Sequence, residues 1–391
     1  MANEDTPAIR IAQARKHRGL TQEGLALKIN VSRSLLAHVE RGAKPASQAL
    51  IGAVARVCGV DVAWLQGQPY EPLDGLIPPL RRALSHPSIL PPPDVPPRPL
   101  PTLVVELRRL QRMQEDTDHT ALGAALPSVL EELVATATEI GTPQGYRALN
   151  HGYAIAASLA RRLGYFDLAQ VALDRASWAA DRADNPDIPG LVVLGQSLLM
   201  LTVGSSDIAL NILRPAIARV DTSTPEGLSV LGALRLRAAI AAARMGHAGE
   251  AWEHHGIATE AAERVTQVLR RDPYGAEVTP ANTAIHGCAV ATELGDPDEA
   301  IRRDSGLVLP QHLYAERRAH HDLDMSRALL LAGSYQKAAS RLVRAGEIAP
   351  QMTRFHPAAM ETHRHIRHHL RRDNPTLRRL DRIMGEGAAR M

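Results

Sequence analysis

One phrase, a glycine followed five residues later by an alanine, recurs along the chain and constrains the fold more than any other feature. Its five copies are GYFDLA, GSSDIA, GHAGEA, GDPDEA and GSYQKA, and they begin at Gly164, Gly204, Gly246, Gly295 and Gly333. The spacings between these glycines are 40, 42, 49 and 38 residues. Seven residues before each glycine stands a small residue: Ala157, Ser197, Ala239, Cys288 and Ser326. Such a period predicts a solenoid of paired helices, because small residues let helices approach closely and glycine permits a tight turn.

These features are similar to the tetratricopeptide repeat (TPR), a helical hairpin with a period of about 34 residues. The resemblance implies that residues 102–352 form a TPR-like α-solenoid, with Leu103–Ile140 as a first, degenerate helix pair. A TPR solenoid has a concave surface, lined by the first helix of each pair, that usually binds peptides or small ligands. In the repeat frame, the polar candidates for effector binding in this groove are Arg237, Arg244, Asn282, His286, Asp324 and Arg327, with Glu293 and His320 beside them. For any one of them, the alternative is a solvated position or a salt bridge between repeats.

Proline marks the boundary between this region and a smaller N-terminal one. Residues 69–101 contain twelve prolines. Because proline lacks an amide donor and disfavours helix at the preceding residue, we expect a linker there, interrupted by a short helix around Leu76–Leu84. The net charge is +4 over residues 1–70, −6 over 71–352 and +5 over 353–391, an asymmetry typical of a chain that meets an anionic polymer. We expect residues 353–391 to form a basic C-terminal helix or tail that caps the solenoid, contacts DNA or dimerises.

The N-terminal domain, residues 1–68, is predicted to contain five short helices separated by turn signals. Thr21 is a good N-cap for the second helix, which runs from residue 22 to residue 29. Asn30 tolerates the left-handed conformation that ends a helix, and Ser32 can cap the third helix, Arg33–Arg41.

The run GLTQEGLALKINVSRSLLAHVERGAKPASQALIGAVARVCGV resembles the XRE family of helix-turn-helix repressors, which are similar to the phage lambda and Cro repressors. Turn, caps and apolar positions agree in order. Gly24 departs from the pattern, since the family usually has Glu there to complete a capping box. Arg15 and Glu40 are predicted to form an ion pair that braces the first helix against the third.

The third helix of the N-terminal domain is predicted to be the recognition helix. Such a helix needs an exposed first turn, with polar or forked side chains that reach base edges. Arg33 and Ser34 occupy that turn, and His38 lies one turn on. Leu35 is placed either to touch a thymine methyl or to pack inside the domain, and the resemblance implies a phosphate contact for Gln22. The predicted DNA-binding residues are Gln22, Ser32, Arg33, Ser34, Leu35, His38, Arg41 and Lys44.

Composition and other motifs argue against several other functions. Aromatic residues make up only 3% of the chain, which favours close-packed helices over β-sandwiches. Cys58 and Cys288 are too few for a disulfide framework or a cysteine-based zinc site. His365 shares a helix face with His368 or His369 at metal-ligand spacing, but the neighbouring arginines would repel a cation, so we expect no metal. No P-loop, GxGxxG, HExxH or GxSxG motif stands in a suitable context, so we expect neither an enzyme nor a cofactor.

The combination of an XRE-type helix-turn-helix and a TPR array resembles the RRNPP group of peptide-responsive regulators and a broad set of actinobacterial regulators. The resemblance implies an all-α transcriptional regulator that binds a palindromic double-stranded DNA operator as a homodimer. A peptide, a small-molecule effector or a protein partner would occupy the TPR groove. We expect a cytoplasmic protein with no membrane partner, because no uncharged apolar run reaches ~18 residues and the N-terminus lacks a signal-peptide pattern. The alternative is a TPR adaptor with little sequence-specific DNA binding.

Overall fold

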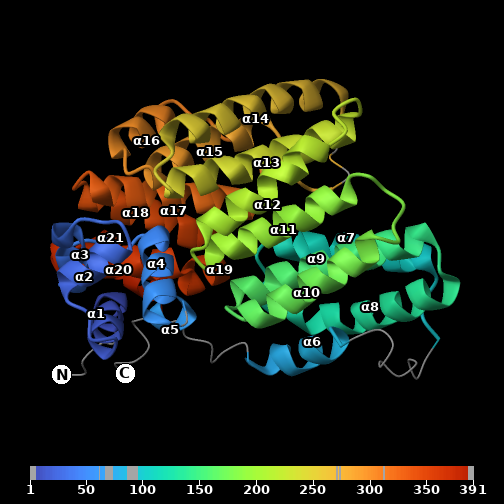
Figure 1. The fold of residues 1–391 in the computed structure, drawn as a ribbon, viewed down its shortest axis with the longest axis horizontal. Helices are drawn as coiled ribbons and strands as arrows, with labels where there is room; N and C mark the ends of the chain where they lie inside the picture. Colours follow the sequence, from blue (N-terminus) through green and yellow to red (C-terminus); the bar gives the residue numbers. More distant parts are fainter. Residues whose placement is uncertain are drawn as a thin grey trace.

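The computed structural model describes residues 6–60, 62–66, 74–85, 96–269, 272, 274–310 and 313–385. Within these ranges the chain is all-α, with helices joined by short turns and no β-strand (Figure 1). No described helix has the length and apolar character needed to cross a membrane.

Five helices form the N-terminal domain, as predicted, and their bounds are α1 (Pro7–His17), α2 (Gln22–Lys28), α3 (Arg33–Glu40), α4 (Gln48–Cys58) and α5 (Val62–Gln66). The predicted caps are confirmed: the Thr21 hydroxyl accepts a hydrogen bond from the Gly24 amide at 3.0 Å, and the Ser32 hydroxyl accepts one from the Leu35 amide at 3.1 Å. Asn30 adopts the expected left-handed conformation, with φ of 54°. The second and third helices each end one residue earlier than predicted, because Ile29 and Arg41 are their C-caps. The fully buried centre of the domain consists of Ile11, Leu25, Leu36, Val54 and Leu65.

Six helical hairpins follow the Pro-rich segment and form a TPR-like solenoid. The pairs are α7 (Leu100–Glu115) with α8 (His119–Ile140), α9 (Pro143–Arg162) with α10 (Phe166–Ala180), α11 (Ile188–Thr202) with α12 (Ser206–Arg219), α13 (Pro225–Arg244) with α14 (Ala248–Val268), α15 (Pro280–Glu293) with α16 (Pro297–Asp304), and α17 (Ala315–Leu331) with α18 (Tyr335–Ile348). All five repeated glycines have φ between 72° and 84°, so each provides the left-handed turn that was expected between paired helices.

The sequence sets the start of three of these helices with the same device. α9, α13 and α15 each begin with a threonine followed by proline. The hydroxyls of Thr142, Thr224 and Thr279 accept hydrogen bonds from backbone amides three residues on, at 3.3, 3.0 and 3.2 Å. Proline at the first helical position costs no hydrogen bond, because its amide would have no partner there.

The solenoid curls so far that early and late helices meet across its concave side (Figure 1). Arg162 at the end of α9 forms an ion pair with Glu316 at the start of α17. The amide of His119, at the start of α8, donates a hydrogen bond to the Gln351 side chain at 3.1 Å. These contacts narrow the concave side around a partly open cavity.

Two segments outside the hairpins are also helical. In the Pro-rich segment, a 3₁₀ turn at Asp74–Leu76 leads into α6 (Ile77–Ala83), which lies where a short helix was expected and packs against α8. Of the predicted linker, residues 69–73 and 86–95 lie outside the described residues. The C-terminal segment, expected as one helix or a tail, contains α19 (Pro350–Phe355), α20 (Pro357–His369) and α21 (Pro375–Ile383). These helices share a core with α17 and α18, so they cap the solenoid.

The N-terminal domain is docked on the solenoid through α4 (Figure 1). Gly52 of α4 lies so close to the turn between α11 and α12 that a Cβ at residue 52 would stand 2.2 Å from the Gly204 Cα. Phe166 packs against the core of the N-terminal domain. The Ala46 amide donates a hydrogen bond to the Glu361 carboxylate of α20 at 3.5 Å. Docking therefore involves both the middle and the C-terminal end of the solenoid.

Candidate functional site

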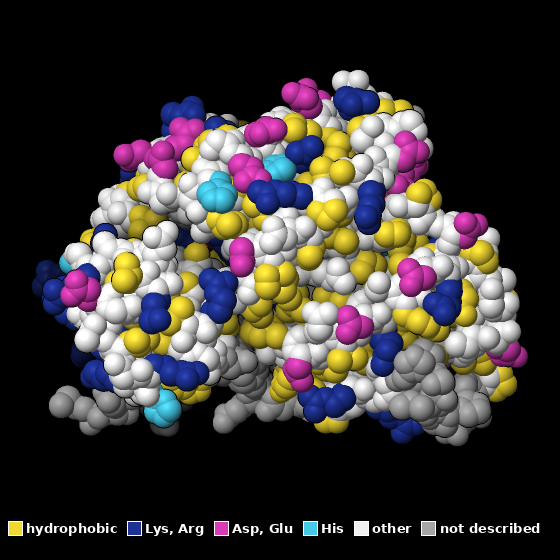
Figure 2. Space-filling view, viewed as in Figure 1, with side chains coloured by type: hydrophobic (Ala, Val, Ile, Leu, Met, Phe, Trp, Pro, Cys, Tyr) yellow, Lys and Arg dark blue, Asp and Glu magenta, His cyan; other side chains and the backbone are white. Residues whose placement is uncertain are grey.

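The first candidate site is the surface around the start of α3. Arg33 and Ser34 are exposed there, as are Arg41 and Lys44 just beyond the helix. Lys and Arg side chains gather over the N-terminal domain, at the left of Figure 2. The Ser32 hydroxyl caps α3, and Arg33 in the first turn of the helix is exposed. An exposed helix N-terminus beside cations is suited to contact with DNA phosphates and base edges.

Three other predicted DNA-binding residues, Leu35, His38 and Gln22, are partly buried or hydrogen-bonded within the domain. Leu35 and His38 are half-buried, and the His38 ring bonds to the Ser34 carbonyl oxygen at 2.6 Å. The side-chain amide of Gln22 donates a hydrogen bond to the Glu40 carboxylate at 2.8 Å. Glu40 also pairs with Arg15 at 2.6 Å, which confirms the predicted ion pair inside the domain. Contact of these residues with DNA stays a prediction.

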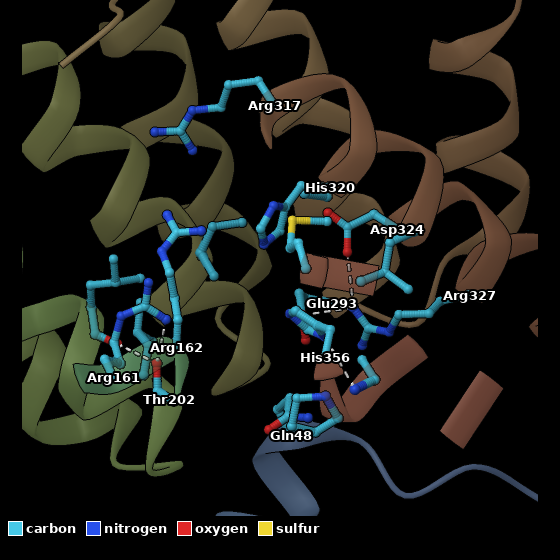
Figure 3. Close-up of a pocket in the computed structure, with 18 of the residues that line it drawn as sticks. Gln48, Arg161, Arg162, Thr202, Glu293, Arg317, His320, Asp324, Arg327 and His356 are labelled. Atoms are coloured by element: carbon cyan, nitrogen blue, oxygen red, sulfur yellow. Dashed lines mark hydrogen bonds and ion pairs between the residues drawn. The ribbon is translucent and has the colours of Figure 1, made fainter. Parts of the chain in front are cut away.

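The second candidate site is a cavity of about 210 Å³ on the concave side of the solenoid (Figure 3). Its walls come from the first helices of successive hairpins, α9, α11, α13, α15 and α17, and from α19 and the start of α20. All of the predicted groove residues line it: Arg237, Arg244, Asn282, His286, Glu293, His320, Asp324 and Arg327.

One side of the cavity carries a set of neutralised charges, which we name the paired cluster: Arg244, Glu293, Asp324 and Arg327. Arg244 and Arg327 each donate to one oxygen of Glu293 at 3.1 Å, and Arg327 also contacts Asp324 at 3.2 Å. Although burial alone would raise it, the pKa of Glu293 is lowered to about 2 by these two guanidinium groups. The predicted alternative of salt bridges between repeats therefore holds for this cluster.

The opposite side carries what we name the cationic cluster: Arg161, Arg162, Arg237 and Arg317. Arg162 pairs with Glu316, and Arg317 lies 3.4 Å from Glu277. Within the described part of the chain, Arg161 and Arg237 form no ion pair; Arg161 donates only a long, 3.4 Å hydrogen bond to the Thr202 hydroxyl. Figure 3 shows Arg161, Arg162 and Thr202 across the cavity from Glu293, Asp324 and Arg327.

The two clusters differ in the direction of their pKa shifts. The pKa of Arg327 is raised, because Glu293 and Asp324 outweigh the opposing effect of burial. The pKa values of Arg161 and Arg237 are lowered to about 9, first by burial and then by neighbouring arginines, Arg162 for Arg161 and Arg317 for Arg237. Positive charge is thus in excess on the cationic side.

Histidines and amides complete the lining. Burial is the main cause, and the charge of nearby arginines a smaller one, that lowers the pKa of His119 to about 3 and that of His286 well below 6.5. Both rings are therefore neutral at pH 7. Asn282 is 1% exposed; its amide nitrogen donates to the Glu277 carbonyl oxygen at 2.8 Å, whereas its Oδ1 atom lacks a hydrogen-bond partner. The cavity therefore holds a buried acceptor as well as excess cations.

The N-terminal domain contributes to the same cavity. Gln48, the first residue of α4, and Gln66, the last of α5, both line it, and the Gln66 amide donates to the Gln48 side chain at 2.9 Å. In Figure 3, Gln48 lies at the lower edge of the cavity, on the ribbon of the N-terminal domain. A molecule in the cavity would therefore touch the domain that carries α3.

Several of these lining residues were not singled out in the sequence, although the repeat frame contains a signal for one of them. Arg162 stands two residues before Gly164, the same offset that Arg244 has from Gly246 and Glu293 from Gly295. Arg161 precedes it directly. No sequence pattern indicated Gln48 or Gln66, because their position depends on how two domains dock.

The histidines and cysteines considered in the sequence analysis do not form a metal site in the described residues. There, no group of three or more His, Cys, Asp or Glu side chains is arranged to hold a metal ion. The C-terminal histidines face different partners: His363 bonds to Asp381 at 2.7 Å, and His365 bonds to Glu361 at 3.2 Å. Cys58 and Cys288 are buried and unpaired.

The fold and the cavity place the protein in a class defined by two parts. The first part is a helix-turn-helix domain, and the second is a TPR-like solenoid on which it is docked, with a cavity that both line. Comparison with known families supports the first part: residues 11–65 match the family described as Helix-turn-helix. The predicted XRE-type domain is thereby confirmed, and this DNA-binding module occupies the N-terminal end of the chain.

Wider comparisons add one likeness. The crystal structure of PlcR from Bacillus thuringiensis, in complex with the peptide PapR7 and DNA, is similar at 12% sequence identity and a TM-score of 0.33. The likeness covers 86% of this chain and 99% of that chain. No curated protein sequence matches the chain.

Proposed function

We propose that the protein is a transcriptional regulator that binds a palindromic DNA operator as a homodimer through α3 and senses an effector in the solenoid cavity. Arg33 and Ser34 would read base edges in the major groove, while Arg41 and Lys44 would contact phosphates. A bidentate contact between arginine and guanine typically contributes ~1–3 kcal/mol of discrimination. Two-fold symmetry would place the half-sites about one helical turn, ~34 Å, apart.

The observation that carries this proposal is the cavity that both domains share. Gln48 and Gln66 line it together with the groove residues of five hairpins. An effector that binds there would contact the solenoid and the DNA-binding domain at once. If its affinity differs between two positions of that domain, it changes their populations, and hence the spacing of the two recognition helices in a dimer.

A selection from a random duplex library tests the DNA-binding part. Full-length protein is expected to enrich a palindromic motif, and the double variant Arg33→Ala, Ser34→Ala is expected to lose it. Arg302→Ala, which removes an arginine with a 69% exposed side chain on α16, is the matched control and should retain the motif.

Two results would contradict the proposal. Enrichment of the same motif by the double variant would mean that α3 does not read the operator. Failure of folded full-length protein to enrich any motif, with or without cell extract as a source of effector, would favour the adaptor function. Capture of a protein partner through the cavity residues would then be the next experiment.

A further inference from the structure

We propose that the cavity binds a small dianion, either a dicarboxylate or a phosphate monoester, whose negative charge lies between Arg161 and Arg237. This inference rests on the proposed role of the cavity as the effector site and names the chemical class of that effector. It is carried by the balance of charge around the cavity, by buried polar atoms that lack partners, and by the size of the cavity.

The balance of charge differs between the two sides. In the paired cluster, two arginines face two carboxylates, so the net charge is zero. In the cationic cluster, four arginines face Glu316 and Glu277, so the net charge is at least +2; burial raises the pKa of Glu277 to about 7, which adds to the positive excess near neutral pH. The two unmatched cations are Arg161 and Arg237.

Unmatched cations are costly when they are shielded from water, because desolvation is not offset by attraction to an anion. The negative charge of Glu316 raises the pKa of both Arg161 and Arg237. Glu316 already forms an ion pair with Arg162, however. Arg237 also has its Nε atom buried without a hydrogen-bond partner. A ligand with two negative charges would offset the two unmatched cations, Arg161 and Arg237. Its oxygens would also match the forked donors of guanidinium groups.

The neutral groups add a second requirement. The Oδ1 atom of Asn282, buried in the cavity lining, can only accept a hydrogen bond. The chemistry of the site thus favours a charged, polar ligand over a purely apolar molecule.

The size of the cavity favours a compact ligand over an extended peptide. Its volume of about 210 Å³ is below the ~300–1,000 Å³ that is usual for sites of drug-sized ligands. Gln48 and Gln66 occupy one side of it and the start of α20 another. A small dianion fits this volume with the N-terminal domain in place, whereas an extended peptide is larger than the volume.

Calorimetric titration of the full chain with two dianions tests the inference and distinguishes the two sources of charge. Succinate represents the dicarboxylates and glycerol 3-phosphate represents the phosphate monoesters; butyrate and glycerol are the singly charged and neutral controls. At least one dianion is expected to bind and its control not to bind. Arg161→Met and Arg237→Met should each weaken that binding roughly tenfold or more, and Arg302→Met should leave it unchanged.

A second readout separates loss of the site from loss of the fold. Because Arg237 is an unmatched cation, Arg237→Met without ligand is expected to unfold at a denaturant concentration equal to or higher than that of the wild type. Arg327→Met should unfold at a clearly lower concentration, because it leaves Glu293 and Asp324 with fewer partners. Destabilisation by Arg237→Met as large as that by Arg327→Met would overturn the inference.

Other outcomes also decide the question. The inference is overturned if neither dianion binds at 10 mM, if butyrate binds as well as succinate, or if both methionine variants bind like the wild type. Selection of an operator by the same preparation would then leave the proposed DNA-binding function standing. Conversely, dianion binding that depends on Arg161 and Arg237, with no operator selected, would support the site and contradict the proposed function.

Discussion

Two regions of this protein are rich in cations, and they differ in how those cations meet water. Around α3, Arg33, Arg41 and Lys44 are exposed and need no internal partner, because water solvates them. In the cavity, arginines are only partly exposed, and most are tied to carboxylates; Arg161 and Arg237 are the exceptions. An unpaired arginine on the surface is ordinary, whereas one inside a cavity carries a desolvation cost, which is why we propose an anion there.

The largest expected effect concerns the paired cluster. Glu293→Gln should lower the free energy of unfolding by about 3–5 kcal/mol, because it leaves Arg244 and Arg327 without their shared carboxylate. Urea denaturation of the full chain measures the change. The control Glu131→Gln removes an exposed partner of Arg82 and should cost no more than about 1 kcal/mol. Equal losses in the two variants would mean that the buried and exposed charges do not differ in the way described.

The next effect concerns the contact that joins the two regions. Gly52→Ala would place a Cβ against the backbone of Gly204, so it should undock the N-terminal domain and cost about 1–3 kcal/mol. Hydrogen exchange of α4 and of the turn between α11 and α12 would rise. Gly256→Ala in α14 meets open space and should instead stabilise the helix by up to about 1 kcal/mol. Unchanged exchange in Gly52→Ala would show that α4 is not held by this contact.

A pH titration tests whether the cavity excludes charge. The pKa of His119 is lowered to about 3 in the folded protein, from about 6.5, by burial and by Arg162. Unfolded chains therefore take up the proton first as pH falls, so stability is lost below pH 6.5 by at most about 1.4 kcal/mol per pH unit for this ring. His119→Asn should have a shallower dependence of unfolding free energy on pH between 6.5 and 5. Gly256→Ala, which changes no titrating group, should keep the wild-type slope.

The smallest expected effect is on the salt dependence of DNA affinity, which should distinguish the exposed cations near α3 from those in the cavity. Arg41→Ala should reduce the dependence of DNA affinity on salt by about one unit in the log–log slope, because one phosphate contact is lost. Arg161→Met, inside the cavity, should leave that slope unchanged. Fluorescence anisotropy with the selected operator, between about 50 and 200 mM salt, measures both. An equal reduction by the two variants would place Arg161 on the DNA-binding surface.

Much of the fold could be predicted because it depends on local signals. Thr21, Asn30 and Ser32 define the turn of the helix-turn-helix through hydrogen bonds and dihedral angles within a few residues. The repeated glycines mark the turns between paired helices in the same way. Caps and turns are short-range properties, and a single sequence contains all the information that they need.

Part of the candidate site could also be predicted from the sequence, because residues at the same offset in each repeat occupy equivalent positions in the groove. Arg237, His286 and Asp324 each stand nine residues before a repeated glycine, and all of them line the cavity. The offset does not indicate which charges neutralise each other. Glu293 pairs with Arg244 and Arg327 of the hairpins on either side of its own, and the packing of adjacent hairpins sets these contacts.

The sequence by itself determined the five-helix N-terminal domain and its caps, the paired helices of the repeats and eight of the polar residues that line the groove. Only the tertiary structure decided that the solenoid curls until Arg162 meets Glu316, that α4 docks at Gly204, and that Gln48 enters the cavity. The physical reason is range. Helices and turns are set by interactions over a few residues, whereas curvature and docking sum many weak contacts between surfaces far apart in the chain.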